Sequence, residues 1–289
     1  MVEIKPNQMI KVQRNQRVAF TLLSLSAAFT VLILFAIIFY IMAQGLSVIS
    51  WEFLFDEPRR MGTEGGIFPA IVGTIYLVAL IILIAAPIGI GSAIFLNEYI
   101  NEGPFKSFLR FGTELLAGIP SIVHGMFGFI FFVIILGDYT GGWSYLSGAL
   151  TGVVMILPII IRASEEALRS VPNGLKEGSL ALGTTRWYTI KKVVLPLAIP
   201  GITTSIILSI GRVIGETAAF LLTLGGSLLM ATSIFDGGRT LALHLYLVAM
   251  ETGDTEMAFG AGAVLIILII IINFAATYLF KFLVKQFSA

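Results

Sequence analysis

The sequence lacks cysteine altogether and is poor in histidine and in charge. With no Cys and 2 His among 289 residues, disulfide scaffolds, thiolate metal sites and cysteine nucleophiles are excluded. Charged residues make up 12%, about half of the ~25% typical of soluble domains. The 18 Lys+Arg nearly cancel the 17 Asp+Glu, so no overall basic field attracts nucleic acid. This composition excludes a soluble globular domain and gives no indication of nucleic-acid binding.

The sequence is rich in apolar side chains. They make up 57% of the residues, and the mean hydropathy is +0.96. A helix needs about 20 mainly apolar residues to cross a bilayer. The runs are continuous rather than alternating, which argues against strands. We predict an all-α membrane protein with six transmembrane helices near 18–43, 68–96, 113–136, 145–162, 200–225 and 259–283.

These spans predict a single transmembrane domain over 18–289, behind an N-terminal segment 1–17. The first span is far longer than the apolar core of about 7–15 residues in a signal peptide, so we expect an uncleaved anchor helix. The end of the fifth apolar window, near 225–235, is the weakest part of the assignment. It is either outer loop or a short extra helix outside the membrane.

The basic residues predict the direction of the spans. Fourteen Lys and Arg residues fall in the segments 1–17, 97–112, 162–192 and 281–285, against three, at positions 59, 60 and 239, on the opposite side. Basic residues concentrate on the cytoplasmic side of membrane proteins. Both termini are therefore expected in the cytoplasm.

The cytoplasmic segment 163–192 predicts two short helices. Ser170 or Asn173 suits the start of the first, Gly183 suits its end, and Thr185 or the residue before it suits the start of the second. The second helix combines aromatic and basic side chains. Such a pair suits docking of another protein, and the alternative is an interfacial helix whose aromatic rings lie among lipid headgroups.

The spacing within this segment carries a resemblance. Glu177 is followed by Gly183 and then by Val193, Leu195 and Pro196. This resembles the signature loop of ABC importer permeases, which reads Glu-Ala-Ala, three residues, Gly, nine residues, Ile-x-Leu-Pro. The resemblance implies the type I (MetI-like) permease fold, in which this loop couples to an ATP-hydrolysing subunit. The residues expected at that contact are Glu177, Gly183, Arg186, Trp187, Leu195 and Pro196.

The chain itself has no nucleotide-binding motif of the P-loop type, Gly-x4-Gly-Lys-Ser/Thr. The only lysine followed by Ser or Thr is Lys106, and Phe105 precedes it. We therefore expect a transport subunit rather than an enzyme, with no cofactor or metal of its own. ATP and Mg would belong to a partner ATPase.

One predicted span contains two charges, Arg212 and Glu216, which would share one face of a continuous helix. A charge at the bilayer centre costs about 2.5–3.5 kcal/mol on insertion scales. The two are either a structural ion pair or part of a polar path, in which Arg212 meets an anion and Glu216 orients it. Intramembrane charges favour the second interpretation. The planar fork of an arginine also suits a tetrahedral oxyanion.

Other polar residues extend this candidate path. Arg162, at the cytoplasmic end of the fourth span, is a second basic candidate or an ordinary anchor. Thr217 and Ser121 offer hydroxyls, although a threonine commonly bonds its own helix backbone. His124 follows Pro120 in the third span. A lone histidine more often makes a local hydrogen bond than lines a passage.

Three further runs sharpen the resemblance. They read Gly118-Ile-Pro-Ser-Ile-Val, Leu157-Pro-Ile-Ile-Ile-Arg162 and Ile214-Gly-Glu-Thr-Ala218, and they resemble permeases of phosphate-specific ABC importers. The outer segment 62–74 resembles most the A-type (PstA) of two paralogous permease subunits. The resemblance implies transport of inorganic phosphate. The alternatives are the C-type paralogue, or a permease for another oxyanion such as molybdate, sulfate or phosphonate.

The same resemblance implies the partners and the location. They are a second permease subunit (PstC-like), a dimer of ATP-binding subunits (PstB-like) and an extracytoplasmic phosphate-binding protein (PstS-like), assembled in a prokaryotic inner membrane. A secondary transporter would instead show paired broken helices, which the sequence does not reveal. A membrane enzyme would need a clustered catalytic set, and a pure scaffold would leave Arg212 and Glu216 unexplained.

Overall fold

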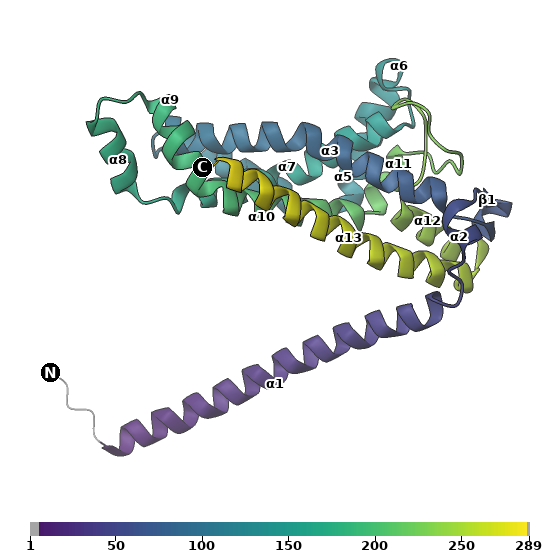
Figure 1. Cartoon of the computed structure of the whole chain (residues 1–289), viewed down its shortest axis with the longest axis horizontal. Helices are drawn as coiled ribbons and strands as arrows, with labels where there is room; N and C mark the ends of the chain where they lie inside the picture. The colour runs from purple at the N-terminus through teal and green to yellow at the C-terminus, as the bar shows by residue number, and fades with distance from the viewer. Residues whose placement is uncertain (1–5, 288–289) are drawn as a thin grey trace.

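Helices dominate the chain (Figure 1). The computed structural model describes the backbone of residues 6–287 and the side chains of residues 15–279, so Lys5 of the expected segment 1–17 lies outside the described residues. The long helices are α1 (Pro6–Gly45), α3 (Phe68–Ile94), α4 (Pro104–Gly118), α7 (Tyr145–Arg169), α10 (Leu195–Ile214) and α13 (Thr255–Phe287).

Shorter elements connect the long helices. The short α-helices are α2 (Trp51–Phe55), α5 (Ser121–Gly128), α6 (Gly137–Thr140), α8 (Asn173–Ala181), α9 (Arg186–Thr189), α11 (Ala218–Thr223) and α12 (Leu241–Leu247). Segments of π-helix are η2 (Phe95–Tyr99), η3 (Phe129–Ile135), η4 (Ile190–Val194) and η5 (Val248–Thr252). Strands β1 (Pro58–Arg59) and β2 (Glu64–Gly65) pair antiparallel around the 3-10 turn η1 (Arg60–Gly62).

Five helices are long and apolar enough to cross a membrane, and a sixth span results if one bent pair counts as one crossing. Four of the five are close to the spans expected from the sequence, whereas the span expected over 200–225 runs from Arg186 to Ile214. The bent pair is α4 with α5–η3, which meet at an angle of 100°.

The span predicted over 113–136 is therefore sharply bent rather than one continuous helix. Ile119 is extended (φ −71°, ψ 132°), and Pro120 follows it without an N–H to donate. A residue before proline is driven out of the helical region. The chain accordingly turns at this point, and the amphipathic α4 lies across the bundle instead of continuing α5.

The predicted helix over 200–225 is also broken. α10 ends before Gly215, a residue of low helix propensity. The Glu216 carboxylate then accepts a hydrogen bond from the Ala219 N–H at 3.1 Å, which stabilises the start of α11. The apolar composition predicted helix on both sides but not the break between them.

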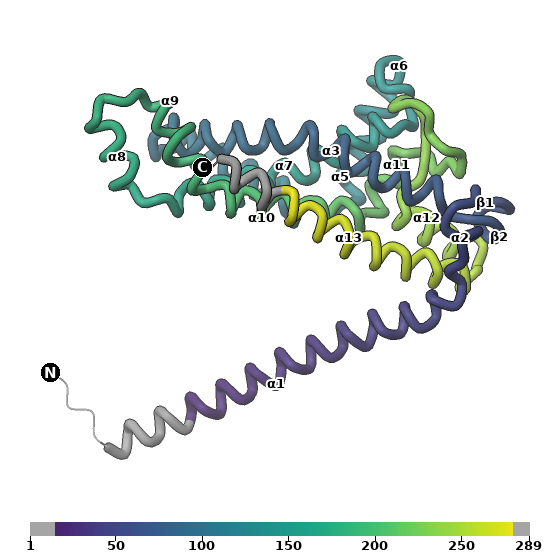
Figure 2. The backbone as a smooth tube through the Cα atoms, in the orientation of Figure 1, coloured from purple at the N-terminus to yellow at the C-terminus, as the bar shows by residue number. Residues whose placement is uncertain are grey.

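The core lies where α3, α7 and α10 pack together. Glycine permits close approach of these helices. A Cβ on Gly152 of α7 would lie 2.3 Å from the Ile81 side chain of α3. Helix α1, in contrast, packs through its last turns alone as far as its side chains are described (from residue 15), and there the Tyr40 ring meets Phe259 of α13 edge-on at 5.6 Å. The rest of α1 diverges from the bundle (Figure 2).

The bundle has two distinct ends (Figure 1). We call them the α8 end, which carries α8 and α9, and the α12 end, which carries α2, the β1–β2 hairpin, α6 and α12. At the α12 end the segment 225–235 is irregular. The short extra helix considered for that segment lies later, as α12 and η5.

Candidate translocation and coupling sites

Arg212 lies in the last turn of α10, and its side chain is exposed. A Cβ added to the neighbouring Gly211 would meet nothing within 4 Å, so this face of α10 is open. Among the residues that the structure describes, no ion pair engages Arg212. Its guanidinium is therefore exposed, and its role in a polar path stays a prediction.

Glu216 is 6% exposed and belongs to the break between α10 and α11. The expectation that it shares a helix face with Arg212 is wrong, because the helix ends between them. Its described partner is the Ala219 N–H. The structure therefore gives Glu216 a helix-capping contact, and its role in a polar path stays a prediction.

The two broken helices meet at small residues. A Cβ on Gly125 of α5 would lie 2.8 Å from the Ala219 Cα of α11. Ser121 and Thr217, both half-buried, stand at the starts of α5 and α11. His124 is 5% exposed, and neither ring nitrogen has a protein partner. The local hydrogen bond expected for this histidine is not made within the described residues.

Arg162 is exposed and pairs with Glu114 of α4 at 3.3 Å. The hydroxyls of Ser164 (α7) and Ser205 (α10) lie 3.5 Å apart and fix the register of these helices. At 1.5 Å per residue, Arg212 then lies about 8 Å farther from the α8 end than Arg162. The two candidate basic residues of the path therefore occupy different depths of the bundle.

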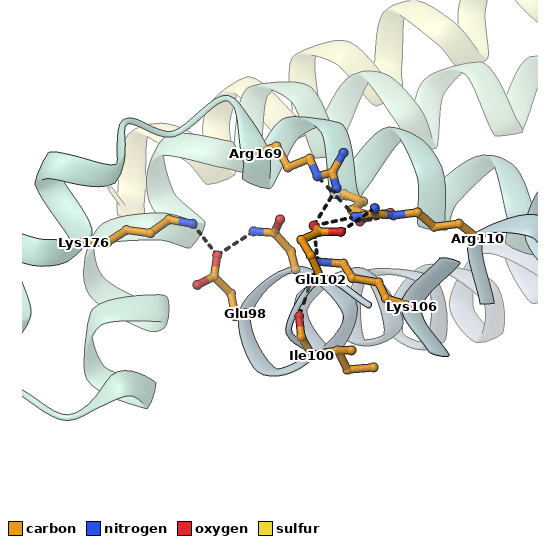
Figure 3. A network of polar contacts seen from close by, with 9 residues as sticks. Glu98, Ile100, Glu102, Lys106, Arg110, Arg169 and Lys176 are labelled. Atoms are coloured by element: carbon orange, nitrogen blue, oxygen red, sulfur yellow. Dashed lines mark hydrogen bonds and ion pairs between the residues drawn. The ribbon is translucent and has the colours of Figure 1, made fainter. Parts of the chain in front are cut away.

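An ion-pair network, which sequence reasoning missed, joins several elements at the α8 end (Figure 3). Glu102 contacts Lys106 at 3.0 Å, Arg110 at 3.1 Å and Arg169 at 3.2 Å. Hydrogen bonds from Lys106 and Arg110 lower the pKa of Glu102 to about 2. Arg110 also binds the buried carboxylate of Glu165 at 2.5 Å. These contacts fasten the start of α4 to the end of α7.

A second link reaches the coupling segment. Lys176 of α8 binds Glu98 of η2 at 2.6 Å, and both side chains are largely buried. Positions 98 and 176 are so far apart in the chain that no sequence spacing indicates the pair. The pair ties α8 directly to the end of the long helix α3.

Helices α8 and α9 form the two-helix segment expected over 163–192. Thr185 caps α9 by accepting the Tyr188 N–H, and Gly183 adopts a left-handed φ of +82° between the helices. These two predictions are confirmed. The predicted side-chain cap of the first helix is wrong, because Pro172 precedes α8 and makes no such hydrogen bond.

The surface of this segment is open to a partner. Glu177, Gly183, Arg186 and Trp187 are exposed, with Trp187 at 59%. Leu195 and Pro196 are half-buried and line a groove of about 690 Å³ beside Lys191 and Lys192.

The comparisons with known proteins show the family. Residues 85–288 match the family model described as "Binding-protein-dependent transport system inner membrane component". This chain belongs to that family. It is 37% identical to "Probable ABC transporter permease protein YqgI" of Bacillus subtilis, over 95% of this chain and 98% of that protein. It is also 37% identical to "Phosphate transport system permease protein PstA 1" of Mycobacterium tuberculosis, over 73% of this chain and 68% of that protein.

Solved structures show the fold. The chain superposes on a bacterial ABC transporter involved in the import of alginate with a TM-score of 0.68, covering 95% of this chain and 98% of the other at 16% identity. The MetNI methionine ABC transporter gives 0.58, over 74% and 93%, at 20% identity. The type I (MetI-like) permease fold and the resemblance to phosphate permeases of the PstA type are thereby confirmed.

Family membership also decides how the broken helices are interpreted. Paired broken helices were not expected from the sequence, but the structure has two, α4–α5 and α10–α11. Such breaks also occur in secondary transporters. Here they belong to the membrane component of an ABC importer, so they do not favour a secondary transporter.

Proposed function

We propose that this chain is the permease subunit of an ATP-driven importer that carries inorganic phosphate into a prokaryotic cell. The observation that carries the proposal is the exposed guanidinium of Arg212, unpaired among the described residues at the open end of α10. Its fork suits two oxygens of a tetrahedral oxyanion. Relatives at 33–37% identity that are named phosphate transport permeases support phosphate as that anion.

In this proposal the α8 end faces the cytoplasm and the α12 end faces outward. The α8 end carries most of the basic residues of the described chain, including those of the ion-pair network, as the positive-inside rule requires. Helix α1 starts, and α13 ends, toward the α8 end (Figure 1). Both termini then belong to the cytoplasmic side.

The working complex contains this chain, a PstC-like second permease, two PstB-like ATP-binding subunits and a PstS-like phosphate-binding protein. A solved alginate transporter described as bound to a periplasmic protein supports this kind of assembly. ATP and Mg are held by the ATPase subunits. The exposed residues of α8 and α9 provide the surface that contacts them.

Motion of the ATPase subunits reaches the bundle through polar links. A shift of α8 pulls on Glu98 through Lys176. Because η2, which carries Glu98, follows α3 directly, the same shift also moves the end of α3. A shift of the end of α7 pulls on α4 through Arg110 and Glu165. The bundle then opens toward the α12 end, and the anion passes Arg212 before Arg162. Binding at each position stays weak enough for release.

The test is phosphate uptake by the assembled transporter in proteoliposomes. Arg212→Gln keeps a polar side chain but removes its charge, and we expect uptake to fall at least a hundredfold while membrane insertion and co-purification of the partners are unchanged. Arg59→Gln is the matched control. That arginine is exposed at the α12 end, and within the described part of the chain its ion pair is with Asp56 alone, so its loss leaves uptake intact.

Three results would contradict parts of the proposal. Wild-type uptake by Arg212→Gln would remove Arg212 from the path. Uptake of molybdate, sulfate or phosphonate in preference to phosphate by the wild-type complex would assign a different oxyanion. Purification in mild detergent without an ATPase subunit and a second permease would contradict the assembly.

A further inference from the structure

Arg239, at the α12 end, is a buried arginine without a counter-ion. It is 9% exposed. Its Nε–H donates to the Gly226 carbonyl, whereas Nη1 is shielded and has no protein partner. Among the described residues no carboxylate lies within ion-pair distance of it. A guanidinium withdrawn from water in this way is costly unless an anion joins it.

His244 supplies a second donor in the same region. It lies on α12, is 1% exposed, and its Nδ1 has no protein partner. Burial lowers the pKa of His244 to about 4, and the charge of Arg239 adds to this effect. The guanidinium of Arg239 is therefore near enough to act on the charge of His244, and its own positive charge favours an anion at this place.

A strained turn covers His244. A Cβ on Gly62 would lie 2.8 Å from the His244 Cε1 and 3.0 Å from Val248. Three consecutive residues of this turn, η1, have left-handed φ angles: Arg60 at 45°, Met61 at 61° and Gly62 at 98°. Non-glycine residues adopt such angles only under constraint, and they concentrate in clamps and switches. Figure 1 shows the hairpin that carries η1 at the same end as α12.

We propose that Arg239 and His244 form an oxyanion-binding position at the α12 end, covered by η1, which holds inorganic phosphate before it reaches Arg212. The inference rests on the proposed phosphate transport. It adds a position formed by α12 and the residue before its N-cap, separate from α10. The turn η1 must lift for the anion to enter, and its left-handed residues favour that movement.

The chemistry of the position selects an oxyanion. Arginine donates parallel N–H groups to two oxygens of one anion, and the Nδ1 of His244 adds a donor from a different element. The carboxylate of Glu251, on η5, acts on Arg239 only at long range and is itself exposed. The position therefore has net positive character and no internal anion.

The test measures binding directly. The assembled transporter in nanodiscs, without binding protein and without ATP, is titrated with ³²P-labelled inorganic phosphate. We expect saturable binding that weakens at least tenfold in Arg239→Gln and severalfold in His244→Leu. His244→Gln keeps a donor and is expected to bind more tightly than His244→Leu. Arg59→Gln is the charge-matched control and is expected to bind like the wild type.

A variant of the second site separates the two positions. Arg212→Gln is expected to lose uptake but to retain binding that depends on Arg239. If Arg239→Gln binds phosphate like the wild type, the inference is wrong. If the wild-type complex transports phosphate but shows no such binding, the inference fails and the proposed function stands. If the complex neither binds nor transports phosphate, both fail.

The covering turn is tested separately. Gly62→Ala places a methyl group against His244 and displaces η1, so we expect phosphate to associate and dissociate at least threefold faster. Gly142→Ala is the matched control, because Gly142 also has a left-handed φ of +71° but nothing within 4 Å of its Cβ position. Equal rates in the two variants would show that η1 is not a cover. If Gly62→Ala does not assemble, Met61→Gly, which relieves the strain without adding atoms, is expected to slow both rates.

Discussion

A buried imidazole makes the stability of the protein depend on pH. Burial lowers the pKa of His244 to about 4, below the ordinary value of 6.5 for histidine. Between these values an unfolded chain binds a proton that the folded chain excludes. The contribution of His244 to the free energy of unfolding is therefore complete above pH 6.5. It is lost as the pH falls toward 4, by at most ~1.4 kcal/mol per pH unit.

We expect the thermal midpoint of the wild type in detergent to fall between about pH 6.5 and pH 4.5 by more than that of His244→Gln, which cannot titrate at this position. His124 and the carboxylates are common to both proteins, so the difference reports on His244. Parallel curves for the two proteins would mean that the imidazole is not protected from protonation.

At the scale of residues, the sequence identifies unusual polar side chains more readily than it identifies the residues with which they pair. Arg212 stands out because it interrupts an apolar run, and the structure leaves it exposed on α10. Glu102 and Lys176 carry no such signal, since their partners depend on how α4, α7 and α8 pack. From the sequence, Arg239 serves only as one of the basic residues that predict the direction of the spans. Its burial comes with a hydrogen bond to the Gly226 carbonyl, which no local pattern indicates.

The crossing of α5 and α11 depends on the absence of a side chain at Gly125. A Cβ there would lie 2.8 Å from the Ala219 Cα and 3.2 Å from two backbone oxygens of α11. Backbone atoms cannot rotate away, so overpacking costs about 1–3 kcal/mol. We expect Gly125→Ala to lower the thermal midpoint and to reduce uptake, because it separates the two helices that carry Ser121 and Thr217.

Gly118→Ala is the control on the neighbouring element. A Cβ at Gly118, the last residue of α4, meets nothing within 4 Å. Replacing a helical glycine by alanine is neutral or stabilises by up to about 1 kcal/mol. Equal loss of stability in both variants would contradict close packing at the α5–α11 crossing.

At the scale of elements, apolar composition is sufficient to predict the long helices but not the places where two of them are interrupted. Helices α3, α7, α10 and α13 follow from long runs with few charges. The bend at Pro120 and the break at Gly215 lie inside apolar runs, so hydropathy alone joins each run into one span. Pro120 indicates a bend in its run, but not the angle of 100° between α4 and α5–η3. The motif Gly-Glu-Thr at positions 215–217 indicated a polar path through the membrane. The hydrogen bond from the Ala219 N–H to Glu216 at the helix break depends on the folded backbone, so the motif does not predict it.

At the scale of the whole molecule, the direction of insertion is the prediction on which the mechanism depends. The fold brings the basic ion-pair network, α8 and α9 to one end, and the hairpin, α12 and Arg239 to the other. Because the chain contains no cysteine, a single introduced thiol reports unambiguously on one position. Met61 and Leu182 suit this purpose, being 60% and 86% exposed at opposite ends.

We expect a membrane-impermeant maleimide to label Met61→Cys in intact cells and Leu182→Cys only after permeabilisation. The chain is expressed without its ATPase subunit, so that no partner shields α8. The reverse labelling pattern would place α8 outside the cell, out of reach of a cytoplasmic ATPase, and would put Arg239 on the wrong side to receive phosphate. The positive-inside distribution, the coupling role of α8 and the outer anion position are therefore tested together by these two residues.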